Sequence, residues 1–357
     1  MSIYITPRAL LKGHAASEAI SVGWAWPLLG GQMAFAAMDV SLRENGARKP
    51  LGTITRAAYE KEARGIPADL RGVISRQLAA LAGAPAPFVV QEKIPALMGV
   101  LNVTPDSFSD GGRYHTPDAA IERGLVMATA GAAIIDVGGE STRPGAAPVA
   151  VDEEMARVVP VVKGLAHAGL SVSIDTRHAA VMEAAIAAGA QIVNDITALE
   201  GDADSLRVVA KSGVRVVLMH MQGTPQTMQE NPTYVWAPGD IYDALAARIV
   251  ACERAGIPKS KIAVDPGVGF GKTDTHNAEI LEHMALFHGL GCALMLGVSR
   301  KGFIGRMSKG EPADQRLPGS LAGALHGARL GVHILRVHDV AETLQALAVA
   351  EHFAAGG

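Results

Sequence analysis

The chain has 357 residues, enough for one large barrel-sized domain with a smaller companion or for two medium-sized domains. Apolar residues make up 49% of it, aromatic residues only 4%, and glycine is abundant. This composition suits helices packed closely over a parallel sheet. The formal net charge of −3 gives no electrostatic reason to expect nucleic acid or an anionic membrane as a partner.

Cysteine usage and hydrophobicity favour a cytoplasmic protein. Cys252 and Cys292 lie in apolar segments without a CxxC pattern or metal-ligand spacing, so we expect reduced core residues. The N-terminus lacks the basic and then apolar pattern of a secretory signal. Residues 19–38 carry no charge, but Pro27 and several glycines interrupt any membrane-spanning helix. A β-hairpin with strands at 22–28 and 33–40 fits this segment better.

Residues 1–95 form a region of their own, without a recognisable catalytic motif. After the hairpin comes a polar, turn-rich stretch at 43–52. Helical patterns follow at 53–64 and 68–81, and the sequence AGAPAP at 82–87 is typical of a linker. We expect a small α+β accessory region whose role the sequence does not reveal.

From residue 96 onward, short apolar runs alternate with alanine-rich helical patterns. The eight runs cover 96–101, 133–137, 170–174, 191–193, 214–219, 262–264, 293–298 and 332–337. The helical patterns cover 117–130, 151–166, 179–188, 203–212, 240–255, 278–288, 319–330 and 340–353. Eight such units predict an α/β fold of the (β/α)8 TIM-barrel type over residues 96–357. A doubly wound open sheet is the alternative, although no GxGxxG follows the first run.

Polar residues follow every apolar run, at the end where barrel enzymes place their active sites. They are Asn102, Asp136, Glu140, Arg143, Asp175, Arg177, Asn194, Asp195, His220, Asp265, Ser299, Lys301, Arg336 and His338. Each alone could cap a helix or face solvent. All of them at one rim favour a functional site.

The rim residues divide into two chemical groups. Asp175, Asn194 and Asp265 are acceptors suited to a ligand edge that bears several N–H donors. The cationic or donor residues suited to phosphate oxygens are Lys301, Arg336, His338, Asn102 and Arg143. These groups predict a donor-rich heterocycle at one end of the ligand and a polyphosphate at the other. The sequence DPGVGFGK at 265–272 lacks the Walker spacing, so its glycines more simply allow close turns of the backbone.

Eight motifs in order make the chain from residue 96 onward resemble the dihydropteroate synthase family. They read MGVLNVTPDSFSDGG, GGESTRPGA, SIDTR, NDI, MHMQGTP, DPGVGFGK, GVSRKGFIG and RVHDV. The resemblance implies a (β/α)8 barrel that joins 6-hydroxymethyl-7,8-dihydropterin diphosphate to 4-aminobenzoate in folate biosynthesis, and a target of sulfonamides. It implies nothing for residues 1–95.

The resemblance also implies roles for individual residues. The pterin diphosphate would contact Thr142, Asp175, Asn194, Asp265, Lys301, Arg336 and His338. The 4-aminobenzoate would contact Phe108, Thr142, Arg143, Pro144 and Ser299. Catalysis would depend on Lys301, Arg336, His338, Asp110 and Arg143. Asn102 would ligate a Mg²⁺ cofactor that bridges the diphosphate.

Several alternatives stay open at this point. A methyltetrahydrofolate-binding methyltransferase-type barrel would share the acceptor group but would not need Lys301, Arg336 and His338 to hold diphosphate. A non-catalytic pterin-binding relic would be expected to lose the first polar loop, which is intact here. His220 is either a packed strand-end histidine or a ligand contact. The resemblance implies a homodimer formed through the last barrel helices.

Overall fold

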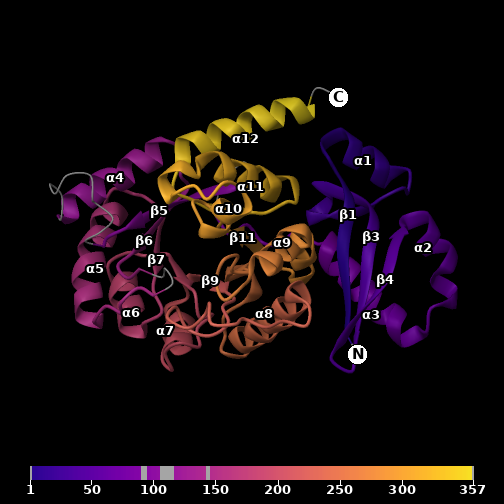
Figure 1. Ribbon diagram of the computed structural model, residues 1–357, viewed down its shortest axis with the longest axis horizontal. Coiled ribbons are helices and arrows are strands. Elements are labelled where there is room, and N and C mark those ends of the chain that lie inside the picture. The colour runs from indigo at the N-terminus through magenta and orange to yellow at the C-terminus, as the bar shows by residue number, and fades with distance from the viewer. Residues whose placement is uncertain (1, 90–94, 105–115, 142–144, 356–357) are drawn as a thin grey trace.

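The computed structural model describes residues 2–89, 95–104, 116–141 and 145–355. An antiparallel sheet with its helices comes first, and a closed barrel of eight parallel strands follows (Figure 1). The α/β barrel preceded by a small α+β region is therefore confirmed. Within the described ranges, none of the helices is both long and apolar enough to cross a membrane.

The N-terminal sheet is organised around its longest strand, β3 (Met33–Glu44). β3 pairs antiparallel with the other three strands, β1 (Ser2–Lys12), β2 (Trp26–Leu28) and β4 (Ala47–Thr55). The helices are α1 (Gly13–Ser21), α2 (Arg56–Glu62) and α3 (Ala68–Ala82). This region has its own apolar cluster, which includes Ile5, Leu28 and Phe35 of the sheet and Ile74 of α3.

The N-terminal predictions are only partly right. The hairpin pairing is confirmed, but its first strand begins at Trp26, because the amides of residues 22–25 bond to carbonyls near the end of α1. The strand β1 was not predicted. The polar stretch 43–52, expected to be rich in turns, contains the turn of a second hairpin between β3 and β4, in which Asn45 and Gly46 have φ angles of 49° and 78°. An Asn-Gly pair is the usual sequence of such a tight turn, so the signal was present. The helix expected from residue 53 begins at Arg56, with the Thr55 side chain as its N-cap.

All eight predicted barrel strands are present, each with ends within two residues of those expected. They are β5 (Ala96–Asn102), β6 (Ile134–Gly138), β7 (Val172–Asp175), β8 (Ile192–Asp195), β9 (Arg215–Met219), β10 (Ile262–Asp265), β11 (Ala293–Leu296) and β12 (Ile334–Val337). Each pairs in parallel with the next, and β12 pairs with β5 to close the barrel. The carboxyl ends of all eight strands consequently lie at one rim.

The barrel helices also follow the sequence. They are α4 (Pro117–Thr129), α5 (Val151–His167), α6 (Ala179–Ala187), α7 (Ser205–Ser212), α8 (Ala237–Arg254), α9 (Asp274–Glu282), α11 (Leu317–Arg329) and α12 (Val340–Ala355). The pattern at 278–288 spans two elements, because α9 ends at Glu282 and a 3-10 segment, Met284–Leu290, follows it. The short helix α10 (Gly302–Met307) was not predicted.

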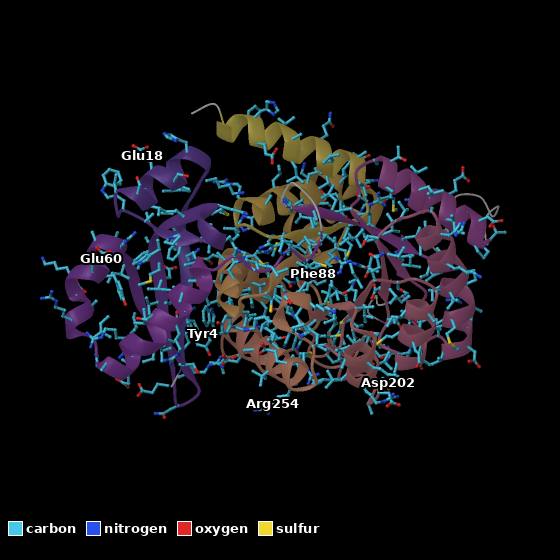
Figure 2. The ribbon with its side chains drawn as sticks, turned by 180° about the vertical axis from the view of Figure 1, so that it is seen from behind. Tyr4, Glu18, Glu60, Phe88, Asp202 and Arg254 are labelled. Atoms are coloured by element: carbon cyan, nitrogen blue, oxygen red, sulfur yellow. The ribbon has the colours of Figure 1, made fainter. Side chains whose placement is uncertain are left out.

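Phe88, which follows the predicted linker, packs inside the barrel near the amino ends of the strands (Figure 2). It belongs to an apolar cluster with Met98, Ile134 and Ile334. The guanidinium of Arg215 lies 5.7 Å from its ring centroid and donates to its carbonyl oxygen. Apolar side chains thus fill the amino end of the barrel. The candidate functional side chains lie at the opposite rim, at the carboxyl ends of the strands.

The N-terminal sheet contacts the barrel through aromatic and charged side chains. Tyr4 (labelled in Figure 2) packs edge-on against Trp236, with ring centroids 5.4 Å apart, and its hydroxyl donates to Asp243 at 2.6 Å. Arg43 forms ion pairs with both Asp240 and Asp243 of α8. Asp240 also accepts the backbone amides of residues 235 and 236 and so fixes the start of α8.

Replacing Arg43 with methionine is expected to lower the free energy of unfolding by about 1–2 kcal/mol, because charged hydrogen bonds in a half-buried contact are lost. Chemical denaturation measures this loss. Arg207→Met is the matched control: Arg207 and Asp204 form a pair in which both side chains are 63% exposed, so the expected change is below about 0.5 kcal/mol. Equal effects of the two substitutions would contradict the inference.

Candidate active site

Four polar side chains from four strands form one hydrogen-bonded cluster at the rim. Arg336 of β12 donates from Nε to Oδ2 of Asp136 at 2.7 Å and from Nη2 to Oδ2 of Asp175 at 2.6 Å. Asn194 of β8 donates its amide to the same Asp136 oxygen at 3.0 Å. The structure therefore brings together three predicted site residues, Asp175, Asn194 and Arg336.

Asp136 lies at the centre of this cluster, although the sequence analysis counted it only among the rim residues and assigned it to neither chemical group. Its side chain is fully buried, and its Oδ1 has no hydrogen-bond partner among the described residues. The signal for a buried role was a single carboxylate inside an otherwise apolar strand, because a buried charge needs hydrogen-bond partners. Acceptors and cations were expected on separate sides of the site, but they meet at Arg336. The reason is that two carboxylates buried on the neighbouring strands β6 and β7 need a cation between them.

Burial sets the ionisation of this cluster. It raises the pKa of the Asp175 carboxyl, and the paired Arg336 limits that rise. Burial alone would lower the pKa of Arg336, but Asp136 and Asp175 hold it above its usual value. Arg336 is therefore a permanent positive charge at the rim.

Asp265 ends β10 and is only 3% exposed. Its Oδ1 accepts the amide of Gly267 at 2.7 Å. Burial raises the pKa of Asp265, while Lys301, the Gly267 amide and Lys272 oppose that rise. A methyl group added at Gly297 would lie 3.9 Å from Oδ2 of Asp265 and 3.6 Å from Cβ of Arg336. Asp265 and Arg336 thus border the same space.

Lys301 precedes α10, and its Nζ donates to the carbonyl of Val268. The ammonium lies 4.7 Å from the ring centroid of Phe270. Burial lowers the pKa of Lys301 to about 8, with Asp265 acting in the opposite direction. Lys301 therefore lies within electrostatic range of Asp265.

Two further predicted residues, Ser299 and His338, lie together. Nδ1 of His338 is 3.0 Å from Oγ of Ser299, and the backbone amide of His338 donates to the same oxygen at 3.2 Å. Asn102 ends β5, and its Oδ1 lies 3.7 Å from a methyl group placed at Gly138. Oδ2 of Asp175 lies 3.6 Å from the same point, so Asn102 faces the central cluster.

His220 makes contacts within the protein. Its Nδ1 is 3.2 Å from Nζ of Lys272, and its backbone amide donates to the carbonyl of Asp265 at 3.0 Å. Burial and the neighbouring Lys272 lower the pKa of His220 to about 3. The packed alternative for His220 is therefore favoured. The predicted residues Phe108, Asp110, Thr142, Arg143 and Pro144 lie outside the described residues.

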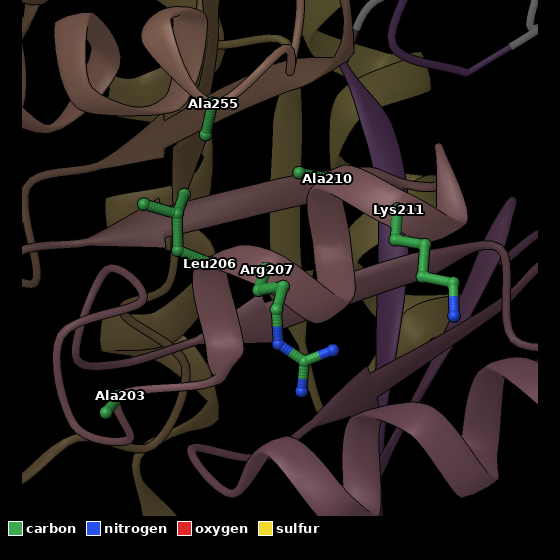
Figure 3. A pocket seen from close by; sticks show the side chains of 6 residues that line it. All are labelled: Ala203, Leu206, Arg207, Ala210, Lys211 and Ala255. Carbon is green, nitrogen blue, oxygen red and sulfur yellow. The ribbon is translucent and has the colours of Figure 1, made fainter.

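A shallow depression of about 520 Å³ lies on the outside of the barrel (Figure 3). It is lined by residues of α7 and its flanking loop together with Ala255 after α8: Ala203, Leu206, Arg207, Ala210, Lys211 and Ala255. It includes none of the strand-end groups described above. The candidate active site is therefore the rim cluster.

Comparison with known proteins agrees with this geometry. A family model described as pterin binding enzyme matches residues 98–338. The dihydropteroate synthase of Escherichia coli (strain K12) is 47% identical over 258 residues, which cover 72% of this chain and 91% of that protein.

Solved structures agree as well. The Xanthomonas albilineans dihydropteroate synthase with 4-aminobenzoic acid has a TM-score of 0.69 at 45% identity and covers 74% of this chain and 94% of its own. The Yersinia pestis dihydropteroate synthase in complex with a sulfonamide drug has the same TM-score and identity and covers 73% and 95%. The chain belongs to the dihydropteroate synthase family of pterin-binding enzymes and is a transferase of folate biosynthesis.

Proposed function

We propose that this chain joins 6-hydroxymethyl-7,8-dihydropterin diphosphate to 4-aminobenzoate and releases dihydropteroate and diphosphate. The observation that carries the proposal is the buried cluster of Asp136, Asp175, Asn194 and Arg336 beside Asp265 and Lys301. The cluster provides hydrogen-bond acceptors for a heterocycle and cations for a leaving diphosphate. Membership of the dihydropteroate synthase family supports the same reaction.

The pterin ring would lie against the acceptor residues. Asp265 would accept paired hydrogen bonds from the 2-amino and N3–H groups, and Asp175 and Asn194 would contact the remaining polar atoms of the ring. Lys301 would donate to the ring oxygen and N5. A buried site favours this recognition, because a ligand lacking these donors would leave the carboxylates unpaired.

The diphosphate would be held by Arg336 and His338, with Thr142 as a further contact. Breaking the C–O bond moves negative charge onto the diphosphate, and the positive charge of Arg336 would stabilise it. The pterin methylene carbon becomes electron-poor, and Asp110 would stabilise it. The neutral aromatic amine then forms the C–N bond and loses a proton. No protein nucleophile is needed in this sequence of events.

The 4-aminobenzoate would bind at the outer side of the rim. Ser299, which contacts His338, supports this position. Phe108, Thr142, Arg143 and Pro144 complete the proposed site. Arg143 would pair with Asp110 when both substrates are bound.

Mg²⁺ would fit beside the diphosphate. The amide oxygen of Asn102 and a carboxylate oxygen of Asp175 approach the same point near Gly138, and hard oxygen donors are what Mg²⁺ prefers. Within the described ranges, no three His, Cys, Asp or Glu side chains gather as metal ligands. Asn102 would hold the ion together with diphosphate oxygens. When bound, Mg²⁺ would neutralise charge on the leaving group.

The assay that tests the proposal measures diphosphate release with and without 4-aminobenzoate. Release that requires both substrates is the expected result. A methyltransferase-type barrel would release no diphosphate, and a pterin-binding relic would bind the pterin without turnover. Growth of a folate auxotroph carrying the gene, with Asp265→Ala and Lys301→Ala as inactive controls, provides a second readout.

Replacing Asp265 with asparagine is expected to weaken pterin binding by about 1–3 kcal/mol, because a charged acceptor in a buried site is lost. Isothermal titration with 6-hydroxymethyl-7,8-dihydropterin gives the dissociation constant. Asp274→Asn, at the start of α9, where the side chain pairs with Arg306 at the surface, serves as the control and should bind like the wild type. A wild-type dissociation constant for Asp265→Asn would count against the assignment.

We further propose that residues 1–95 form an accessory region, that two copies associate through the last barrel helices, and that the enzyme is cytoplasmic. Cys252 and Cys292 are buried and free, which is typical of proteins in reducing compartments. Light scattering of the full chain tests the dimer.

A further inference from the structure

Lys272 is a buried lysine to which none of the roles above is assigned. Its side chain is 1% exposed, which is rare for lysine unless the ammonium is fully paired. Nζ lies 2.7 Å from the carbonyl oxygen of Phe270, 3.1 Å from the carbonyl oxygen of His220 and 3.2 Å from Nδ1 of His220. Lys272 therefore joins the loop after β10 to the end of β9.

The contacts suit a protonated lysine. An ammonium has three donors and no acceptor, and three acceptors surround Nζ. Nδ1 of His220 serves as an acceptor when the ring is neutral, and the low pKa of His220, about 3, keeps it neutral. Burial lowers the pKa of Lys272 well below its usual value; Asp265 opposes this shift and Lys301 adds to it.

The same residues fix the geometry of the Asp265 carboxylate. Gly267, whose amide bonds to Oδ1 of Asp265, has a φ of 68° and packs directly against the backbone of His220. A methyl group at Gly267 would lie 2.0 Å from the His220 carbonyl oxygen and 3.3 Å from Nζ of Lys272. The lysine thus borders the turn that orients Asp265.

The loop at 266–272 also contacts Lys301, the other residue proposed to bind the pterin. The Val268 carbonyl accepts from Lys301, and the Gly269 amide bonds to the side chain of Asn277 at 2.7 Å. The Tyr234 hydroxyl donates to the Gly271 carbonyl at 2.8 Å. The titratable groups that act on Lys272 are His220 from β9, Asp265 from β10 and Lys301 before α10.

We propose that Lys272 is a positioning residue for pterin recognition: it fixes the loop that orients Asp265 and places a second positive charge near that carboxylate. This inference rests on the proposed role of Asp265. Lys272 itself does not touch the pterin. Its effect reaches the substrate through Asp265, which must be an anion to accept two hydrogen bonds.

The test compares Lys272→Met with Lys261→Met. Lys261 precedes the same strand at its other end and donates to the carbonyl of Gly213, so it is a matched lysine away from the rim. The dissociation constant of 6-hydroxymethyl-7,8-dihydropterin is measured from pH 5 to pH 9. We expect Lys272→Met to bind about tenfold more weakly at pH 7, which corresponds to one pKa unit. The acidic fall in affinity should also move to higher pH, because Asp265 protonates more easily.

A double-mutant cycle separates this role from general destabilisation. In the Asp265→Asn background, Lys272→Met should weaken binding by less than about twofold, because the charge on which it acts is gone. Lys272→Gln can still donate to two carbonyls and replaces the methionine variant if that variant does not fold. If Lys272→Met or Lys272→Gln binds the dihydropterin with wild-type affinity and a wild-type pH profile, the inference is overturned. An equal loss of affinity in both backgrounds would overturn it as well.

The two proposals fail in different ways. If the wild-type enzyme does not bind the dihydropterin at all, the proposed function fails. If the wild type binds it and Lys272→Gln binds identically at every pH, only the role of Lys272 fails.

Discussion

Replacing Arg336 with methionine is expected to reduce kcat/KM for the pterin diphosphate by at least about 100-fold, because the cation that stabilises the departing diphosphate is lost. The substitution also removes the cation that bonds to both the buried Asp136 and the largely buried Asp175. Breaking a buried ion pair by removing one partner destabilises a protein by about 3–5 kcal/mol. The variant should therefore lose stability as well as turnover.

Steady-state kinetics and chemical denaturation measure these two effects separately. Arg306→Met is the matched control, because Arg306 forms a comparable pair with Asp274 on the exposed surface. It should retain wild-type turnover and lose less than about 1 kcal/mol. Full turnover in Arg336→Met would refute the proposed role in diphosphate departure. Stability equal to that of the control would refute the importance of the cluster for folding.

Replacing Lys301 with methionine is expected to have the second largest effect, a loss of about 100-fold in kcat/KM, since a charged donor to the ring is removed inside a buried site. The wild-type enzyme should show a pH dependence that the variant lacks. The pKa of Lys301 is lowered to about 8 by burial. The lysine is therefore charged below pH 8 and becomes neutral as the pH rises through that value.

Wild-type kcat/KM should accordingly fall on the alkaline side of about pH 8, and this fall should be absent in Lys301→Met. Lys309→Met, at an exposed position beyond α10, is the control and should keep the wild-type profile. A variant that retains the alkaline fall would assign it to another group and contradict the role given to Lys301.

The sequence by itself determined the barrel. Each strand is covered on both faces, so it needs a continuous apolar run, and the run must end where the chain reaches the polar rim. Both requirements act within a single stretch of sequence. The apolar runs and the polar residues after them could therefore be predicted in chain order. The N-terminal sheet was harder to predict, since its long strands alternate only weakly between buried and exposed positions. β4, for example, is exposed over most of its length.

Only the tertiary structure decided which side chains meet at the rim. Arg336 bonds to Asp136 and Asp175, which lie 200 and 161 residues earlier in the chain, and Lys272 reaches His220 across 52 residues. No periodicity records such pairings, because they depend on barrel closure and on the need of each buried charge for a partner. The sequence supplied the polar groups at the strand ends. Closure of the barrel placed Arg336 between the carboxylates and Lys272 beneath the loop that orients Asp265.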